Sequence, residues 1–113
     1  MKLVISSDVA FDVRFTLNDA GKPVEFGFRV EAKRTDQPQP GSGETVGDYL
    51  DKRAKVRMVS WVDDLSPLEG DDGKPVAAGT EALAALYELL PNMPGLVLGA
   101  YLEATGAKAK SGN

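Results

Sequence analysis

Apolar residues occupy every second position in two stretches near the N-terminus, from Phe11 to Leu17 and from Val24 to Ala32. A period of two is typical of a strand with one buried face. The residues between these stretches, 18–23, are typical of a turn. We therefore predict an antiparallel β-hairpin over residues 10–33, and a shorter apolar run at residues 3–5 fits a brief third strand.

The predicted hairpin carries all four phenylalanines of the chain on one face. A two-stranded ribbon is only marginally stable in water. This face must therefore be covered, either by the rest of the chain or by another molecule. Phe26 and Phe28 are accordingly candidates for binding a partner.

The apolar period changes to that of a helix after Thr80, a residue type that suits an N-cap. Leu83, Leu86 and Leu90 follow at the spacing of one helical face. Pro91 ends the pattern, because proline has no N–H to donate and disfavours helical geometry in the residue before it. We predict a helix over residues 80–90.

A second C-terminal helix is predicted over residues 93–105. Asn92 can cap it, and Gly106 suits the left-handed position that follows a helix. Because only a few residues separate the two helices, we expect them to pack as a helical hairpin.

The stretch from 45 to 62 has two interpretations. Thr45 and Asp48 have the spacing of a helix-capping pair, and six apolar residues then fall along one helical face: Val46, Leu50, Ala54, Met58, Trp61 and Leu65. The run 56–59 also alternates, so its far end fits a strand as well. We favour a helix throughout, because the stripe continues over several turns.

These elements predict an α+β fold, an N-terminal antiparallel β-hairpin followed by a small bundle of about three α-helices. We divide the chain into a hairpin arm (1–34), a flexible linker (35–43), a helical domain (44–106) and a disordered tail (107–113). The linker boundary rests on the polar, proline-rich sequence of 37–40 and the tail on its lack of large apolar residues.

Composition narrows the possible functions. The 113 residues carry a net charge of −4, which argues against a nucleic-acid-binding surface. There is no cysteine and no histidine, so Ser-His and Cys-His nucleophile pairs and the usual zinc ligands are excluded. No apolar run reaches the length that spans a membrane. We expect a cytoplasmic protein that binds neither nucleic acid nor membrane.

The acidic residues between Asp63 and Asp72 are the one cluster that could form a metal or acid–base site. A calcium loop needs carboxylates at its first, third and fifth positions. Frames built on Gly70 or Gly73 do not supply them. We interpret the cluster as a solvated acidic turn and expect no cofactor, no metal and no enzyme activity.

Apolar residues beyond the needs of a small core indicate a binding surface. Trp61 has two interpretations, a core residue that closes the helical stripe or an exposed interface anchor. Leu98 and Leu102 lie on the opposite side of their helix from Tyr101, so that helix is apolar around most of its circumference and is expected to be buried on all sides. All four are candidate partner-binding residues.

The order of these features resembles the tail assembly chaperones of long-tailed, siphovirus-type bacteriophages. A tryptophan begins the pattern (Trp61-Val62-Asp63-Asp64), and an acidic turn with glycine and proline follows (Asp71-Asp72-Gly73-Lys74-Pro75). A leucine-rich helix, Pro91 and a helix containing Ala100-Tyr101 complete it. The hairpin ahead of the helices is similar to the strand pair of some members.

This resemblance implies a non-enzymatic protein of the bacterial host cytoplasm. Such proteins bind and solubilise the tape measure protein during tail morphogenesis and leave as tail tube subunits polymerise around it. We also expect self-association, with the hairpin of one copy packing on the next. The alternatives are another phage structural protein, such as a head–tail joining protein, a small regulatory inhibitor, or a metal-assisted enzyme at the acidic turn.

Overall fold

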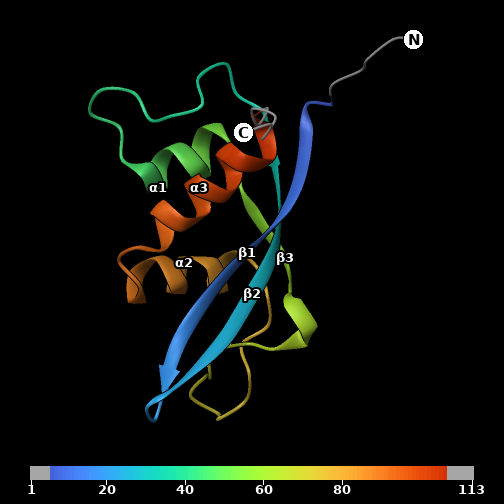
Figure 1. Cartoon of the computed structure of the whole chain (residues 1–113), viewed down its shortest axis with the longest axis vertical. Coiled ribbons are helices and arrows are strands. Elements are labelled where there is room, and N and C mark those ends of the chain that lie inside the picture. Colours follow the sequence, from blue (N-terminus) through green and yellow to red (C-terminus); the bar gives the residue numbers. More distant parts are fainter. Residues whose placement is uncertain (1–5, 107–113) are drawn as a thin grey trace, which may run out of the picture.

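A computed structural model describes residues 6–106 as a three-stranded antiparallel sheet with its longer helices gathered on one side of it, which confirms the α+β class (Figure 1). The strand order is β1-β2-β3. The strands are β1 (Asp8–Asp19), β2 (Lys22–Lys33) and β3 (Arg57–Trp61); the helices are α1 (Val46–Asp48), η1 (Tyr49–Arg53), η2 (Val62–Asp64), α2 (Thr80–Leu89) and α3 (Met93–Thr105). Residues 3–5 and 107–113, for which a strand and a tail were predicted, lie outside the described residues.

The hairpin of β1 and β2 follows the predicted alternation. Its register is continuous from the pair Asp8–Lys33 to the pair Asp19–Lys22. Two residues connect the strands, Ala20 with φ +51° and Gly21 with φ +84°. Positive φ at both turn residues matches the right-handed twist of the strands. A two-residue turn therefore suffices to connect the two strands.

The prediction of a continuous helix over 45–62 is wrong. Helix formation starts as expected, because the Thr45 hydroxyl accepts from the backbone N–H of Asp48 at 3.1 Å. The helical segment ends after Arg53, however, and Lys55 adopts a φ of +53° that no helix continues through. The chain then runs extended as β3, which pairs with β2.

The C-terminal helices match their predicted ranges closely, but two of their predicted caps are wrong. Gly79, not Thr80, is the N-cap of α2. Gly106 follows α3 with φ −93°, which is extended and not left-handed. Asn92 does precede α3, although its side chain makes no capping hydrogen bond.

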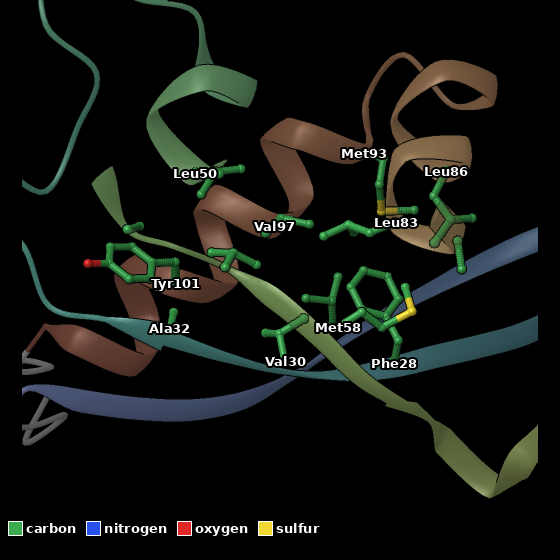
Figure 2. Packing of buried hydrophobic residues seen from close by; sticks show 14 of the residues in the cluster. Phe28, Val30, Ala32, Leu50, Met58, Leu83, Leu86, Met93, Val97 and Tyr101 are labelled. Carbon is green, nitrogen blue, oxygen red and sulfur yellow. The ribbon is translucent and has the colours of Figure 1, made fainter. Parts of the chain in front are cut away.

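The core lies between the sheet and the helices, and the hairpin is part of it. Figure 2 shows Phe28 and Val30 of β2 beneath side chains from η1, α2 and α3, among them Leu50, Leu83 and Tyr101. The hairpin is therefore not a separate arm, because it shares one sheet with β3 and one core with the helices. The segment 35–43 contains no helix or strand, and the hydroxyl of Tyr49 donates to the carbonyl of Gln37 within it.

Candidate partner-binding surface

Trp61 is a core residue in this structure. Its side chain is 8% exposed, and its ring meets that of Phe28 edge-to-face with the centroids 6.2 Å apart. Its indole N–H donates to the carbonyl of Val76 at 2.8 Å. Of the two interpretations that the sequence left open, the structure shows the core residue.

Tyr101 and Phe28 are also buried. The Tyr101 hydroxyl donates to the carbonyl of Lys33 at 2.6 Å, and its ring lies edge-to-face against Phe11 and Tyr49. Phe28 is 0% exposed. Together with Trp61, these residues have almost no surface for a partner, which corrects the expectation drawn from the sequence. Phe26 is half-buried and packs against the ring of Phe15, 6.1 Å away between centroids.

The outer side of α3 keeps an apolar surface in contact with solvent. Met93, Val97 and Tyr101 face the core. Helical geometry turns Gly95, Gly99 and Leu102 away from it, and Leu98 lies at the margin, partly buried against the core; we call these four residues the α3 outer face. Leu98 is half-buried and Leu102 is 37% exposed.

The two glycines of the α3 outer face were not singled out in the sequence. A Cβ added at Gly95 or Gly99 would meet no atom within 4 Å. Neither residue has a positive φ. No contact or backbone strain among the described residues therefore requires glycine there. Their four-residue spacing within an apolar helix is the signal that could have identified them.

The acidic turn is a small, solvated hairpin. Glu69 and Pro75 form an isolated bridge, the amide of Gly70 donates to the carbonyl of Lys74 at 2.8 Å, and Gly73 takes a φ of +75°. The Asp72 carboxylate accepts from the Lys74 amide at 3.0 Å. Within residues 6–106, no group of three or more potential ligands could hold a metal ion.

A cleft of about 390 Å³ lies where α1 and η1 approach α2. Val56, Met58 and Leu83 supply apolar walls, and Tyr87 lines it with a buried hydroxyl that has no hydrogen-bond partner in the described chain. Burial, and to a smaller extent the Asp51 carboxylate, raise the pKa of Tyr87 to about 12. The hydroxyl therefore stays protonated at neutral pH, because the opposing effect of Arg57, which also lines the cleft, is smaller than that of burial.

Two shallow grooves follow β1 where it passes α3. One, of about 280 Å³, lies between Phe11 of β1 and Ala100 of α3. The other, of about 200 Å³, lies between Leu17 of β1 and Leu96 of α3, and Leu96 is 39% exposed. Apolar surface therefore reaches solvent beside β1 as well as on the α3 outer face.

Comparison with known proteins gives no relative. The chain matches no protein-family model, and no curated protein or solved structure shows significant similarity to it. Among residues 6–106, no single helix is long and apolar enough to cross a membrane; α2 and α3 reach that length and composition only as a pair, which is bent by 119°.

Proposed function

We propose that the protein is a phage tail assembly chaperone, a non-enzymatic protein that binds and solubilises the tape measure protein in the cytoplasm of the bacterial host. The order of motifs from Trp61 to Tyr101 supports the proposal through its resemblance to that family. The α3 outer face supports it through its chemistry, because an amphipathic helix binds by laying its apolar side on such a surface.

The exposed glycines of α3 are the observation on which the proposal depends most. Glycine within a helix costs about 1 kcal/mol relative to alanine, and no contact among the described residues offsets that cost at Gly99. Small residues allow the backbones of two helices to approach closely. A partner helix packed closely on this face would explain why glycine is present there.

The leucines of the same face define what such a partner would present. Leu98 and Leu102 are four residues apart and form a ridge beside the glycines. The partner needs apolar side chains at the i, i+3, i+4 and i+7 spacing to pack on this ridge. A long helical protein with an exposed apolar stripe, as a tape measure protein is before the tube encloses it, has that chemistry.

Co-expression with the tape measure protein of a long-tailed phage, a long helical protein, tests the proposal. We expect the parent chain to keep that protein in the soluble fraction and Leu102→Asp to lose this effect while keeping the parent melting temperature. Leu65→Asp is the matched control, because Leu65 is a 45% exposed leucine outside α3. It should solubilise the partner as the parent does.

Two results would count against the proposal in different ways. A parent chain that leaves the long helical protein insoluble would refute the chaperone function itself. If Leu102→Asp solubilises the partner as well as the parent does, the α3 outer face is not the binding surface.

A further inference from the structure

Among residues 6–106, strand β1 forms an open edge of the sheet. It has twelve residues, pairs with β2 on one side, and is the terminal strand in the order β1-β2-β3. Natural edge strands are commonly protected by proline, by a bulge, or by a charge pointing into the core. β1 contains no proline, and its pairing with β2 has no bulge. Its inward side chains are all apolar: Val9, Phe11, Val13, Phe15 and Leu17.

The hydrogen bonds beside the hairpin identify which backbone groups are unpaired. The amide of Arg34 donates to the carbonyl of Ser7 at 2.8 Å, whereas the amide of Lys33 points the other way, to Ala54. Antiparallel strands alternate between hydrogen-bonded and non-hydrogen-bonded pairs. The odd-numbered residues of β1 therefore bond to β2, and the even-numbered residues direct their N–H and C=O groups to the open edge.

We propose that β1 pairs with β1 of a second copy of this chain, antiparallel and about a two-fold axis at Val13. This register places Asp12 of each copy opposite Arg14 of the other. Both are even-numbered residues, so the two pairs are hydrogen-bonded through the open edges. The result is a continuous six-stranded sheet across the dimer. The inference does not depend on the function proposed above.

Charge complementarity selects this register. Asp12 and Arg14 lie on the outer face of the sheet, where they pair with each other at 3.8 Å. Each also has an ion pair with a charged residue of β2: Asp12 with Arg29 and Arg14 with Glu25. Moving the two-fold axis by one residue would set Asp12 against Asp12, or Arg14 against Arg14. Like charges directly opposite each other destabilise a strand pair. Only the axis at Val13 gives both residues an opposite charge.

The inner face is self-complementary in the same register. Phe11 of one copy would lie opposite Phe15 of the other, and Val9 opposite Leu17. In the single chain Phe11 and Leu17 are half-buried and line the grooves between β1 and α3. A second strand along this edge would extend the apolar face over those grooves.

Two charge reversals test the register. Asp12→Arg gives two Arg–Arg oppositions, and Arg14→Asp gives two Asp–Asp oppositions. Each variant alone should weaken self-association, measured by sedimentation or light scattering, by about ten-fold or more. An equimolar mixture of the two should form a heterodimer of nearly parental affinity, because both oppositions become Arg–Asp.

Glu25→Arg is the matched control. It reverses a charge on the same face and removes one of the two ion pairs of Arg14, but it lies on β2, away from the open edge. It should self-associate like the parent, and circular dichroism should show that all the variants fold. Amide exchange in the parent gives a second measurement, since the amides of the even-numbered β1 residues should become protected as concentration rises.

Three outcomes would overturn the proposal. The first is a parent chain that stays monomeric at millimolar concentration. The second is a dimer that neither charge reversal weakens. The third is a mixture of the two variants that stays monomeric, which would exclude the register centred on Val13.

Discussion

Replacing Gly99 by alanine separates the stability of the fold from the binding of a partner. The change adds one methyl group in the middle of α3, where a Cβ meets no atom within 4 Å and the backbone φ is not positive. Neither a clash nor strain opposes it. Alanine is favoured over glycine within a helix by about 0.8–1.0 kcal/mol, so Gly99→Ala should raise the free energy of unfolding by about that amount. The melting temperature should rise by about 4 °C.

Binding should respond in the opposite direction. If a partner helix packs against Gly99, the new methyl group lies between the two backbones, and overpacking of this kind costs about 1–3 kcal/mol. Affinity for the tape measure protein should then fall about ten-fold. Gly47→Ala is the matched control, because Gly47 lies in α1, is equally open, and is absent from the α3 outer face. It should leave binding unchanged.

Thermal unfolding followed by circular dichroism, together with the co-expression assay, distinguishes the outcomes. A destabilised Gly99→Ala variant would refute the reasoning, because it would mean that the α3 outer face is already covered. A stabilised variant that binds its partner as the parent does would show that the glycine serves no interface.

Two further changes test the fold. Ala20 carries a left-handed φ of +51°, which costs a non-glycine residue about 1–2 kcal/mol. Because asparagine suits this turn position, Ala20→Asn should raise the free energy of unfolding, measured by urea denaturation, by about 0.5–1 kcal/mol. An unchanged denaturation midpoint would contradict the turn geometry. Tyr87→Phe removes a buried hydroxyl that has no hydrogen-bond partner among the described residues, and it should raise the free energy of unfolding at neutral pH by about 1 kcal/mol. The folded pKa of Tyr87 is raised from 10.0 to about 12, so above pH 10 the unfolded chain releases this proton first and stability falls with rising pH. When the pH is raised from neutral to above 10, the Tyr87→Phe variant should therefore lose less stability than the parent. Equal losses in variant and parent would contradict this interpretation.

Local sequence patterns predicted the elements whose burial follows one simple period. The hairpin alternates because only one face of β1 and β2 packs against the helices. Helix α2 buries Leu83 and Leu86 and ends before Pro91 for reasons contained within its own residues. The Thr45 cap is equally local. None of these predictions required knowledge of distant contacts.

Strand β3 was predicted wrongly because a β-bulge imitates helical spacing. Met58 pairs with Val30, and Trp61 pairs with Phe28, so both face the core although they are three residues apart. Three residues in a regular strand reach the opposite face. The unpaired Val59, which is 49% exposed, restores the alignment. The spacing that suggested a helix therefore results from pairing with a strand nearly thirty residues earlier.

The candidate binding residues could not be sorted from the sequence for a similar reason. Tyr101 and Leu102 are neighbours in an apolar helix, yet one is 1% exposed and the other 37% exposed. The difference follows from which side of α3 meets β1, where Tyr101 contacts Phe11 and donates to the carbonyl of Lys33. That choice depends on contacts between residues far apart in the sequence. When the whole helix is apolar, the local sequence period cannot indicate which side of the helix faces the core.

The two proposed surfaces have a common origin in the single layer of helices. The described residues form one core on one face of the sheet, and none of them forms a second layer over α3 or along β1. In the proposed dimer both copies of Val13 point to the same side of the joined sheet, so both α3 outer faces lie on that side. One long helix could then contact two copies, and the second contact would form at high effective concentration.

Asp12→Arg, which changes no residue of α3, should therefore weaken binding of a long tape measure protein. Leu102→Asp should weaken that binding without altering self-association. If Asp12→Arg leaves binding at parental strength, the two surfaces act independently and a single copy suffices for the partner.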